Sequence, residues 1–250
     1  MNDKCHNEEF DVKEYLYKIV KDKQKCIDAL TTWSDTQCEN FRKIVDDLNN
    51  ESLTTREQGD KLERIVEFII ENSHFFEIYK NIRTATNEID EVIVLSKQGK
   101  ITLSTLGLQQ NILEINENLF LGECKNYSSK LSVTYVGKFY SLMSISNISF
   151  GILFTRKGLS GDSGGFKDAY GLTKVLRMIE QARCPTKEFY ILTFTDEDYQ
   201  KMVEGISFFE IIKAKKIELR LASDYQRFIN DNKHEAENEV REAIKTISNN

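Results

Sequence analysis

The first fifty residues of the chain carry an apolar pattern with the spacing of an α-helix. From Val12 to Trp33 the pattern advances in alternating steps of four and three residues, which is the repeat of a heptad seam, and neither Gly nor Pro occurs before Gly59. The stripe resumes in a shifted phase at Phe41, which predicts a kink or a second helix. The seam positions are Val12, Leu16, Ile19, Lys23, Cys26, Leu30 and Trp33.

Residues 1–52 are therefore predicted to form an N-terminal helical appendage. A seam of this kind must be covered, and two interpretations stay open. The helices either pack on the chain's own domain, or they form a dimerisation element or a partner site, most simply a homodimer with a second copy. Lys23, the polar residue of the seam, weakens a long coiled coil and favours a short contact.

Residues 53–221 alternate between helical and strand patterns, which predicts an α/β domain with helices on a mixed sheet. Thr54 and Glu57 have the spacing of a capping box, so a helix is expected to begin there. The predicted strands are 87–96, 100–106 after a turn at Gly99, 117–127, 150–155 and 188–195. The predicted helices are 55–72, 133–145, 169–182 and 196–216, with a polar helical tail over 222–250.

The composition of the 250 residues is that of a protein with a sizeable core and a polar surface, because 40% are hydrophobic and 30% are charged. No run of about 18 apolar residues is present, so no membrane helix is expected. The polar, acidic start does not resemble a secretory signal. The five cysteines are scattered without a Cys-x-x-Cys pair, which predicts reduced thiols and a cytoplasmic location.

The charge is unevenly distributed. The net charge is −6, yet the stretch from residue 125 to 157 contains basic residues and no Asp or Glu. Such a stretch is either a solvated face or a surface that contacts phosphate. Its candidate nucleic-acid-binding residues are Lys130, Lys138, Arg156 and Lys157.

One short motif points to a protease, and the rest of the chain argues against it. Gly-Asp-Ser-Gly-Gly at 161–165 is the sequence that surrounds the nucleophilic serine of chymotrypsin-like proteases. A serine needs a histidine base, and neither His6, His74 nor His234 has the expected neighbourhood. Phe166 also stands where that family has proline. Ser163 is therefore interpreted as a residue of a Gly-rich loop.

A pair of carboxylates and a lysine form the candidate site. Glu123 and Lys125 lie two apart on a predicted strand, so they share a face, and Cys124 points the other way. The apolar flank of this strand predicts a central position in the sheet. If the strand that carries Asp90 is its neighbour, Asp90 and Glu123 converge. Two carboxylates and a main-chain carbonyl suit Mg²⁺ or Mn²⁺, and Lys125 would hold or help deprotonate a water activated there.

Several motifs follow one another over about residues 55–215. They are Gly59, Leu62 and Glu63 on a helix; Glu88, Ile89 and Asp90 on a strand; Glu123 to Asn126 on a strand; Val133, Val136 and Phe139 on a helix; and Thr155 before a Gly-containing loop. With these motifs the chain resembles the PD-(D/E)xK nuclease superfamily, and within it the Mrr-type restriction endonucleases. One departure is the helix after Lys125, where Thr134, Tyr135 and Lys138 stand in place of a glutamine found in some relatives.

The resemblance implies a restriction-endonuclease-like core over residues 53–221 and assigns roles within it. Asp90, Glu123 and Lys125 would be catalytic, with Asp90, Glu123, the Cys124 backbone carbonyl and Glu63 as ligands of Mg²⁺ or Mn²⁺. The expected function is a metal-dependent DNA endonuclease in restriction or anti-phage defence. Two alternatives remain: a non-catalytic or partner-activated binding module on the same fold, and an RNA nuclease or junction resolvase with the same site.

Overall fold

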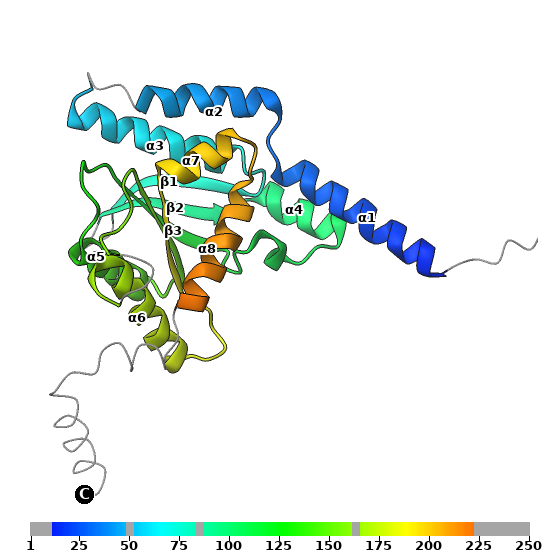
Figure 1. The fold of residues 1–250 in the computed structure, drawn as a ribbon. Helices are drawn as coiled ribbons and strands as arrows, with labels where there is room; N and C mark the ends of the chain where they lie inside the picture. Colours follow the sequence, from blue (N-terminus) through cyan, green and yellow to red (C-terminus); the bar gives the residue numbers. More distant parts are fainter. Residues whose placement is uncertain (1–11, 49–52, 84–87, 162–165, 223–250) are drawn as a thin grey trace, which may run out of the picture.

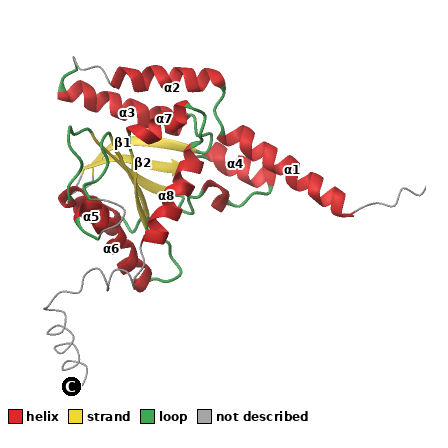
Figure 2. Cartoon of the chain, viewed as in Figure 1, coloured by secondary structure: helices red, strands yellow, loops and turns green. Residues whose placement is uncertain are grey.

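The chain folds around one mixed five-stranded sheet with helices on both faces (Figures 1 and 2). The structure, a computed structural model, describes residues 12–48, 53–83, 88–161 and 166–222. The order of the strands across the sheet is the same as their order in the sequence. They are β1 (Phe76–Arg83), β2 (Glu88–Leu95), β3 (Leu119–Lys125), β4 (Phe150–Thr155) and β5 (Tyr190–Phe194).

Strand direction changes at the centre of the sheet. The β1–β2 and β2–β3 pairs are antiparallel, whereas β3–β4 and β4–β5 are parallel. The central strand is β3, as its apolar flank predicted. The carboxyl ends of β3 and β4 therefore meet at one end of the sheet, which is where ligands bind in sheets of this kind.

Two helical layers cover the sheet, and each has its own hydrophobic cluster. The layer of α5 and α6 lies on the opposite side from α2, α3 and α7 (Figure 1). The helices are α1 (Val12–Thr31), α2 (Asp35–Leu48), α3 (Thr55–Glu71), α4 (Lys97–Leu106), α5 (Val133–Ile145), α6 (Asp168–Arg183), α7 (Asp196–Val203) and α8 (Phe208–Ala222), with a 3-10 turn η1 (Gln110–Leu113).

The N-terminal segment divides into two helices, which agrees with the phase shift at Phe41. Helix α2 packs against α3 and α7 and contributes Phe41, Val45 and Leu48 to the larger core. Helix α1 is different, because no residue of Val12–Thr31 is buried and the helix extends outward beside α4 (Figure 1). Within the predicted appendage of residues 1–52, α2 is thus integrated in the domain and α1 is its projecting part.

Several predicted elements are present with closely matching bounds. Helix α3 begins at the expected capping box, in which Thr54 Oγ1 accepts from the Glu57 amide and the Glu57 carboxylate accepts from the Thr54 amide. Strand β4 covers the predicted 150–155, and all six of its residues are buried. A strand buried on both faces is expected from a continuous apolar run beside parallel neighbours.

The predicted strand at 100–106 is wrong, because this segment belongs to helix α4. The Ser96 hydroxyl accepts from the Gly99 amide and caps the helix, so Gly99 lies inside its first turn. A Cβ on Gly99 would meet the Phe75 carbonyl oxygen at 2.3 Å, which explains a glycine at this close approach. The fifth strand of the sheet is β1, which the sequence did not predict.

The predicted helix over 196–216 is two helices. Gly205 has a φ of +97° and follows the end of α7, and the Ser207 hydroxyl and Glu210 carboxylate cap the start of α8 reciprocally. The predicted tail over 222–250 lies outside the described residues after Ala222, and Ser163 lies outside them too. No helix in the described ranges is both long and apolar enough to span a membrane.

Candidate active site

The pairing of β2 with β3 sets Asp90 opposite Glu123. These strands are antiparallel, with Glu91 paired to Gly122, so the next position outward on each strand is Asp90 and Glu123. Residues directly opposite on adjacent strands share a face of the sheet. The two carboxylates lie on the face covered by α5 and α6, because Leu121 of the same β3 face packs in that layer's cluster.

Lys125 joins the two carboxylates. Its Nζ lies 2.8 Å from Asp90 Oδ2 and 2.7 Å from Glu123 Oε1. The side chains of Lys125, Asp90 and Glu123 are 24%, 31% and 16% exposed, so the cluster is partly shielded and still open to a ligand. The structure thus brings together the three residues that the sequence singled out, and their catalytic roles stay a prediction.

The charged groups of the cluster shift one another's pKa values. Burial raises the pKa of Glu123, and the Asp90 carboxylate adds to that rise against the opposing effect of Lys125. Burial lowers the pKa of Lys125, but its hydrogen bonds to Asp90 and Glu123 outweigh burial and leave this pKa raised. The lysine is therefore an ammonium at neutral pH and serves as a hydrogen-bond donor.

The opposite face of the same strands holds a second, buried carboxyl group. Glu91 is 1% exposed, and its Oε1 accepts from the Cys124 thiol at 3.1 Å. Burial raises the pKa of Glu91 to about 8. Gly122 leaves room for this side chain, since a Cβ there would meet Glu91 Oε2 at 2.4 Å. Cys124 thus points away from the cluster as expected, but it meets a carboxyl group as well as apolar packing.

Glu63 has a different partner from the one that the resemblance implied. Its Oε2 lies 2.8 Å from Lys80 Nζ on β1, and Lys80 also pairs with Glu67 at 3.0 Å. Burial lowers the pKa of Lys80, but the hydrogen bonds to Glu63 and Glu67 dominate and raise it. This ion-pair group bridges α3 and β1, so Glu63 is held by a lysine, and its role as a metal ligand stays a prediction.

The cluster fits a hard divalent cation through its donor chemistry. Asp90 and Glu123 direct carboxylate oxygens at one shared cationic group, the Lys125 ammonium. Oxygen donors of this type suit Mg²⁺ or Mn²⁺. Within residues 12–48, 53–83, 88–161 and 166–222, no three side chains of His, Cys, Asp or Glu are gathered so as to hold a metal ion. The Cys124 main-chain carbonyl therefore stays a predicted third ligand.

Three of the predicted basic residues, Lys130, Arg156 and Lys157, lie in the segments that follow the carboxyl ends of β3 and β4. The Leu131 amide donates to the Gly158 carbonyl, and the Ser160 amide donates to the Leu131 carbonyl. This bridge brings the segment of Lys130 alongside the segment of Lys157. Lys130, Lys157 and Lys138 on α5 are exposed, whereas Arg156 is partly buried and its Nε lies 3.2 Å from Asp196 Oδ2.

Two polar contacts beside the cluster were not predicted. The Asn126 side-chain amide donates to Gln58 Oε1 at 3.3 Å, which ties the end of β3 to α3. The Tyr135 hydroxyl donates to the Tyr127 hydroxyl at 2.9 Å, which ties the segment after β3 to the first turn of α5. The first contact joins segments that are far apart in sequence, so only the fold creates it. The second joins residues eight positions apart, and Tyr127 itself comes two residues after Lys125.

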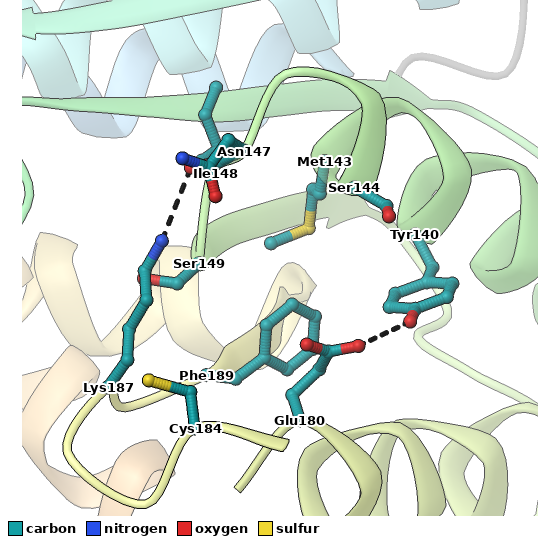
Figure 3. A pocket seen from close by; sticks show the side chains of 10 residues that line it. All are labelled: Tyr140, Met143, Ser144, Asn147, Ile148, Ser149, Glu180, Cys184, Lys187 and Phe189. Atoms are coloured by element: carbon teal, nitrogen blue, oxygen red, sulfur yellow. Dashed lines mark hydrogen bonds between the residues drawn. The ribbon is translucent and has the colours of Figure 1, made fainter.

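A separate hollow of about 240 Å³ lies away from the cluster (Figure 3). It opens beside Ser149 and Phe189, which precede β4 and β5, so it is at the opposite end of the parallel strands. Two of its polar groups are already engaged, since Tyr140 donates to Glu180 and Lys187 donates to the Asn147 carbonyl (Figure 3). None of the predicted site residues lines it.

Comparison of the chain with protein-family models, with curated proteins and with solved structures finds no match. A functional assignment then depends on the chemistry of the cluster itself.

Proposed function

We propose that the chain is a divalent-metal-dependent DNA endonuclease with a restriction-endonuclease-like core. The observation that carries the proposal is the convergence of Asp90, Glu123 and Lys125 at the end of the central strand. Two carboxylates and an ammonium are the groups needed to hold a cation and orient the reactants of phosphodiester hydrolysis. The order of these residues along the strands is the one that the PD-(D/E)xK resemblance implies.

Each group of the cluster has a distinct part in this proposal. The carboxylates of Asp90 and Glu123, with the Cys124 carbonyl, would hold Mg²⁺ or Mn²⁺. When bound, the cation supplies Lewis-acid activation of water and neutralises charge on the phosphate. Lys125 donates hydrogen bonds, which can orient the attacking water or a phosphate oxygen once its present carboxylate partners turn to the cation. The surrounding exposed lysines attract the DNA backbone.

The same resemblance supports a place in restriction or anti-phage defence, which is exercised in the cytoplasm. Cleavage of foreign DNA requires a site that reaches a phosphate on an exposed surface. The cluster meets this requirement because it is partly open and is bordered by a stretch without acidic residues. A binding module that has lost catalysis needs no complete set of two carboxylates and a lysine.

The direct test is a cleavage assay of the purified full chain with Mg²⁺ or Mn²⁺. Supercoiled plasmid, linear duplex, single-stranded DNA and RNA are incubated separately, with EDTA as the control. We expect metal-dependent nicking or cutting of DNA that EDTA abolishes. Cleavage of RNA alone would favour the RNA nuclease alternative. Metal-dependent DNA binding without cleavage of any substrate would favour the non-catalytic module.

A further inference from the structure

The two tyrosines beside the cluster form an aromatic surface at the site. Tyr127 comes two residues after Lys125, and Tyr135 lies in the first turn of α5. Their ring centroids are 5.1 Å apart with an interplanar angle of 43°, and their hydroxyls are hydrogen-bonded. Tyr135 is partly buried against the hydrophobic cluster of the α5 and α6 layer, so it holds Tyr127 through this ring contact and hydrogen bond.

Tyr127 is both exposed and close to the charged groups of the cluster. It is 41% exposed, although a ring of this size is more often covered. Its pKa is raised, mainly by the hydrogen bond with Tyr135, while the charges of Lys125 and Glu123 act on it in opposite directions. The phenol is thus within electrostatic reach of the predicted catalytic groups.

The surroundings of the pair favour a polyanion. From Cys124 to Lys157 the chain has no acidic residue, and Lys130, Lys138 and Lys157 are exposed within this stretch. An exposed ring within a basic segment is the arrangement that binds single-stranded nucleic acid, because a base stacks on the ring while lysines contact the phosphates. A duplex offers its bases only inside its own stack, so it has no base for this ring unless one is unpaired.

We propose that Tyr127, supported by Tyr135, is a stacking platform for an unpaired base of DNA, next to the phosphate that the Asp90, Glu123 and Lys125 cluster holds. The platform directs the chain toward single-stranded DNA or toward duplexes with an unpaired nucleotide at the cleavage point. The position of the phosphate rests on the proposed nuclease function, whereas the stacking itself does not.

The test is equilibrium binding in EDTA, so that binding is measured without cleavage. The full chain is titrated into a fluorescein-labelled single-stranded oligodeoxynucleotide and into the duplex of the same sequence. We expect Tyr127→Ala and Tyr127→Leu to weaken single-strand binding by about 10- to 100-fold, the cost of one lost base stack. Tyr127→Phe keeps the ring and stays within about threefold of the wild type, since only the hydroxyl contact is removed.

The controls separate stacking from folding and from charge. Tyr17→Ala removes an exposed tyrosine of α1 and should leave both affinities unchanged. An oligonucleotide carrying 2-aminopurine should lose fluorescence on binding the wild type and keep it with Tyr127→Leu. Circular dichroism and the melting temperature identify a variant that does not fold. If Tyr127→Ala and Tyr127→Leu do not fold, the wild type is compared with Tyr127→Phe, and both should quench the aminopurine probe because both keep the ring.

Three results would overturn the proposal: no single-strand binding by the wild type, equal losses for single strand and duplex in Tyr127→Leu, or unchanged aminopurine fluorescence. Failure of the nuclease function gives a different pattern. A wild type that binds single strands through Tyr127 but cleaves nothing with Mg²⁺ or Mn²⁺ keeps the platform and rejects the nuclease. Metal-dependent cleavage that Tyr127→Leu affects equally on all DNA forms keeps the nuclease and rejects the platform.

Discussion

The ammonium nitrogen of Lys125 lies 2.8 Å from a carboxylate oxygen of Asp90, although the two are 35 positions apart in sequence. The antiparallel pairing of β2 with β3 makes this contact, and Glu123 completes it from the same face. Such a group of unlike charges at the end of a central strand is costly to shield from water unless its members pair or bind a ligand. Substitutions of Lys125, Asp90 and Glu123 are therefore the most direct tests of function.

Substitution within the cluster should abolish cleavage without unfolding the chain. Lys125→Ala, Asp90→Asn and Glu123→Gln are each expected to lower the cleavage rate by about 100-fold or more, because each removes a group that binds the cation or orients the reactants. The measurement is initial rate on the best DNA substrate, with folding checked by circular dichroism. Lys97→Ala on α4 and Ser163→Ala are the matched controls. An inactive Ser163→Ala beside an active Lys125→Ala would reverse the assignment.

The exposed lysines near the cluster, Lys130 and Lys157, should contribute to DNA binding through their charge alone. Lys130→Ala and Lys157→Ala are each expected to reduce the slope of log affinity against log salt by about one. Arg156→Ala should have a smaller effect, since Arg156 is partly buried and paired with Asp196. The measurement is anisotropy of a labelled duplex over a range of salt. Equal effects of all three substitutions would mean that the ion pair opens on binding.

The position of the site in the sheet is predictable from the sequence, because local pattern and fold agree there. The spacing of Glu123 and Lys125 shows that they share a strand face, and the apolar run before them indicates a central strand. Local pattern and fold disagree at 100–106. The β-branched Ile101 and Thr102 favour a strand there, but the Ser96 cap and the packing of Gly99 on Phe75 select a helix. A capping hydroxyl and a close backbone contact outweigh weak strand propensity.

The features of the site that the sequence did not predict depend on contacts between distant segments. The contact of Glu63 with Lys80 depends on strand β1, which the sequence analysis does not predict. The alternation of Phe76 and Ile78 with Glu77 and Tyr79 was the available signal for β1. Glu91 was likewise adjacent to Asp90 in sequence, but only the pairing with Gly122 makes it a buried carboxyl group.

Glu91 should make the stability of the metal-free chain fall as the pH rises. Its folded pKa of about 8 lies above the ordinary value of 4.5, so the folded state holds this proton more tightly than the unfolded state. Its contribution is full below about pH 4.5, declines between about pH 4.5 and 8, and stays lost above that range. Glu91→Gln keeps the side chain neutral and should remove the decline, which amounts to about 5 kcal/mol at most.

The measurement is urea unfolding in EDTA from pH 5 to 9, with Glu39→Gln on the exposed surface of α2 as the control. We expect the Glu91→Gln chain to be more stable than the wild type at the alkaline end and the control to track the wild type. A parallel decline in Glu91→Gln and wild type would assign the pH dependence to other groups.

Gly122 should resist substitution for a steric reason. In Gly122→Ala the new Cβ would lie 2.4 Å from Glu91 Oε2 and 3.3 Å from the Phe154 ring, inside the core of the sheet. We expect a loss of about 1 to 3 kcal/mol in the free energy of unfolding. Gly137→Ala is the matched control, because a Cβ there meets nothing within 4 Å and alanine favours a helix. Equal stability of the two variants would mean that Glu91 relocates at no cost.

The first turns of α1 should mediate dimerisation of the chain. Leu16 is 54% exposed and Ile19 is 37% exposed, and together with Val12 and Val20 they leave an apolar stripe that water covers in a monomer. Lys23 lies beside Gly107 at the end of α4, so the seam turns toward the domain there and the contact between copies is confined to the first turns of the helix. A symmetric dimer would also supply two clusters for cutting both strands of a duplex.

Light scattering at micromolar concentration tests this assembly. The full chain should be dimeric, while Leu16→Glu and a chain that begins at Leu30 should be monomeric. The truncation stops at Leu30 because Leu30 and Trp33 pack on the main core, and deeper removal would take Phe41, Val45 and Leu48 from it. Leu221→Glu places the same charge at an exposed leucine of α8 and should remain dimeric. A monomeric full-length chain would contradict the dimer, and double-strand cutting would then require assembly on DNA.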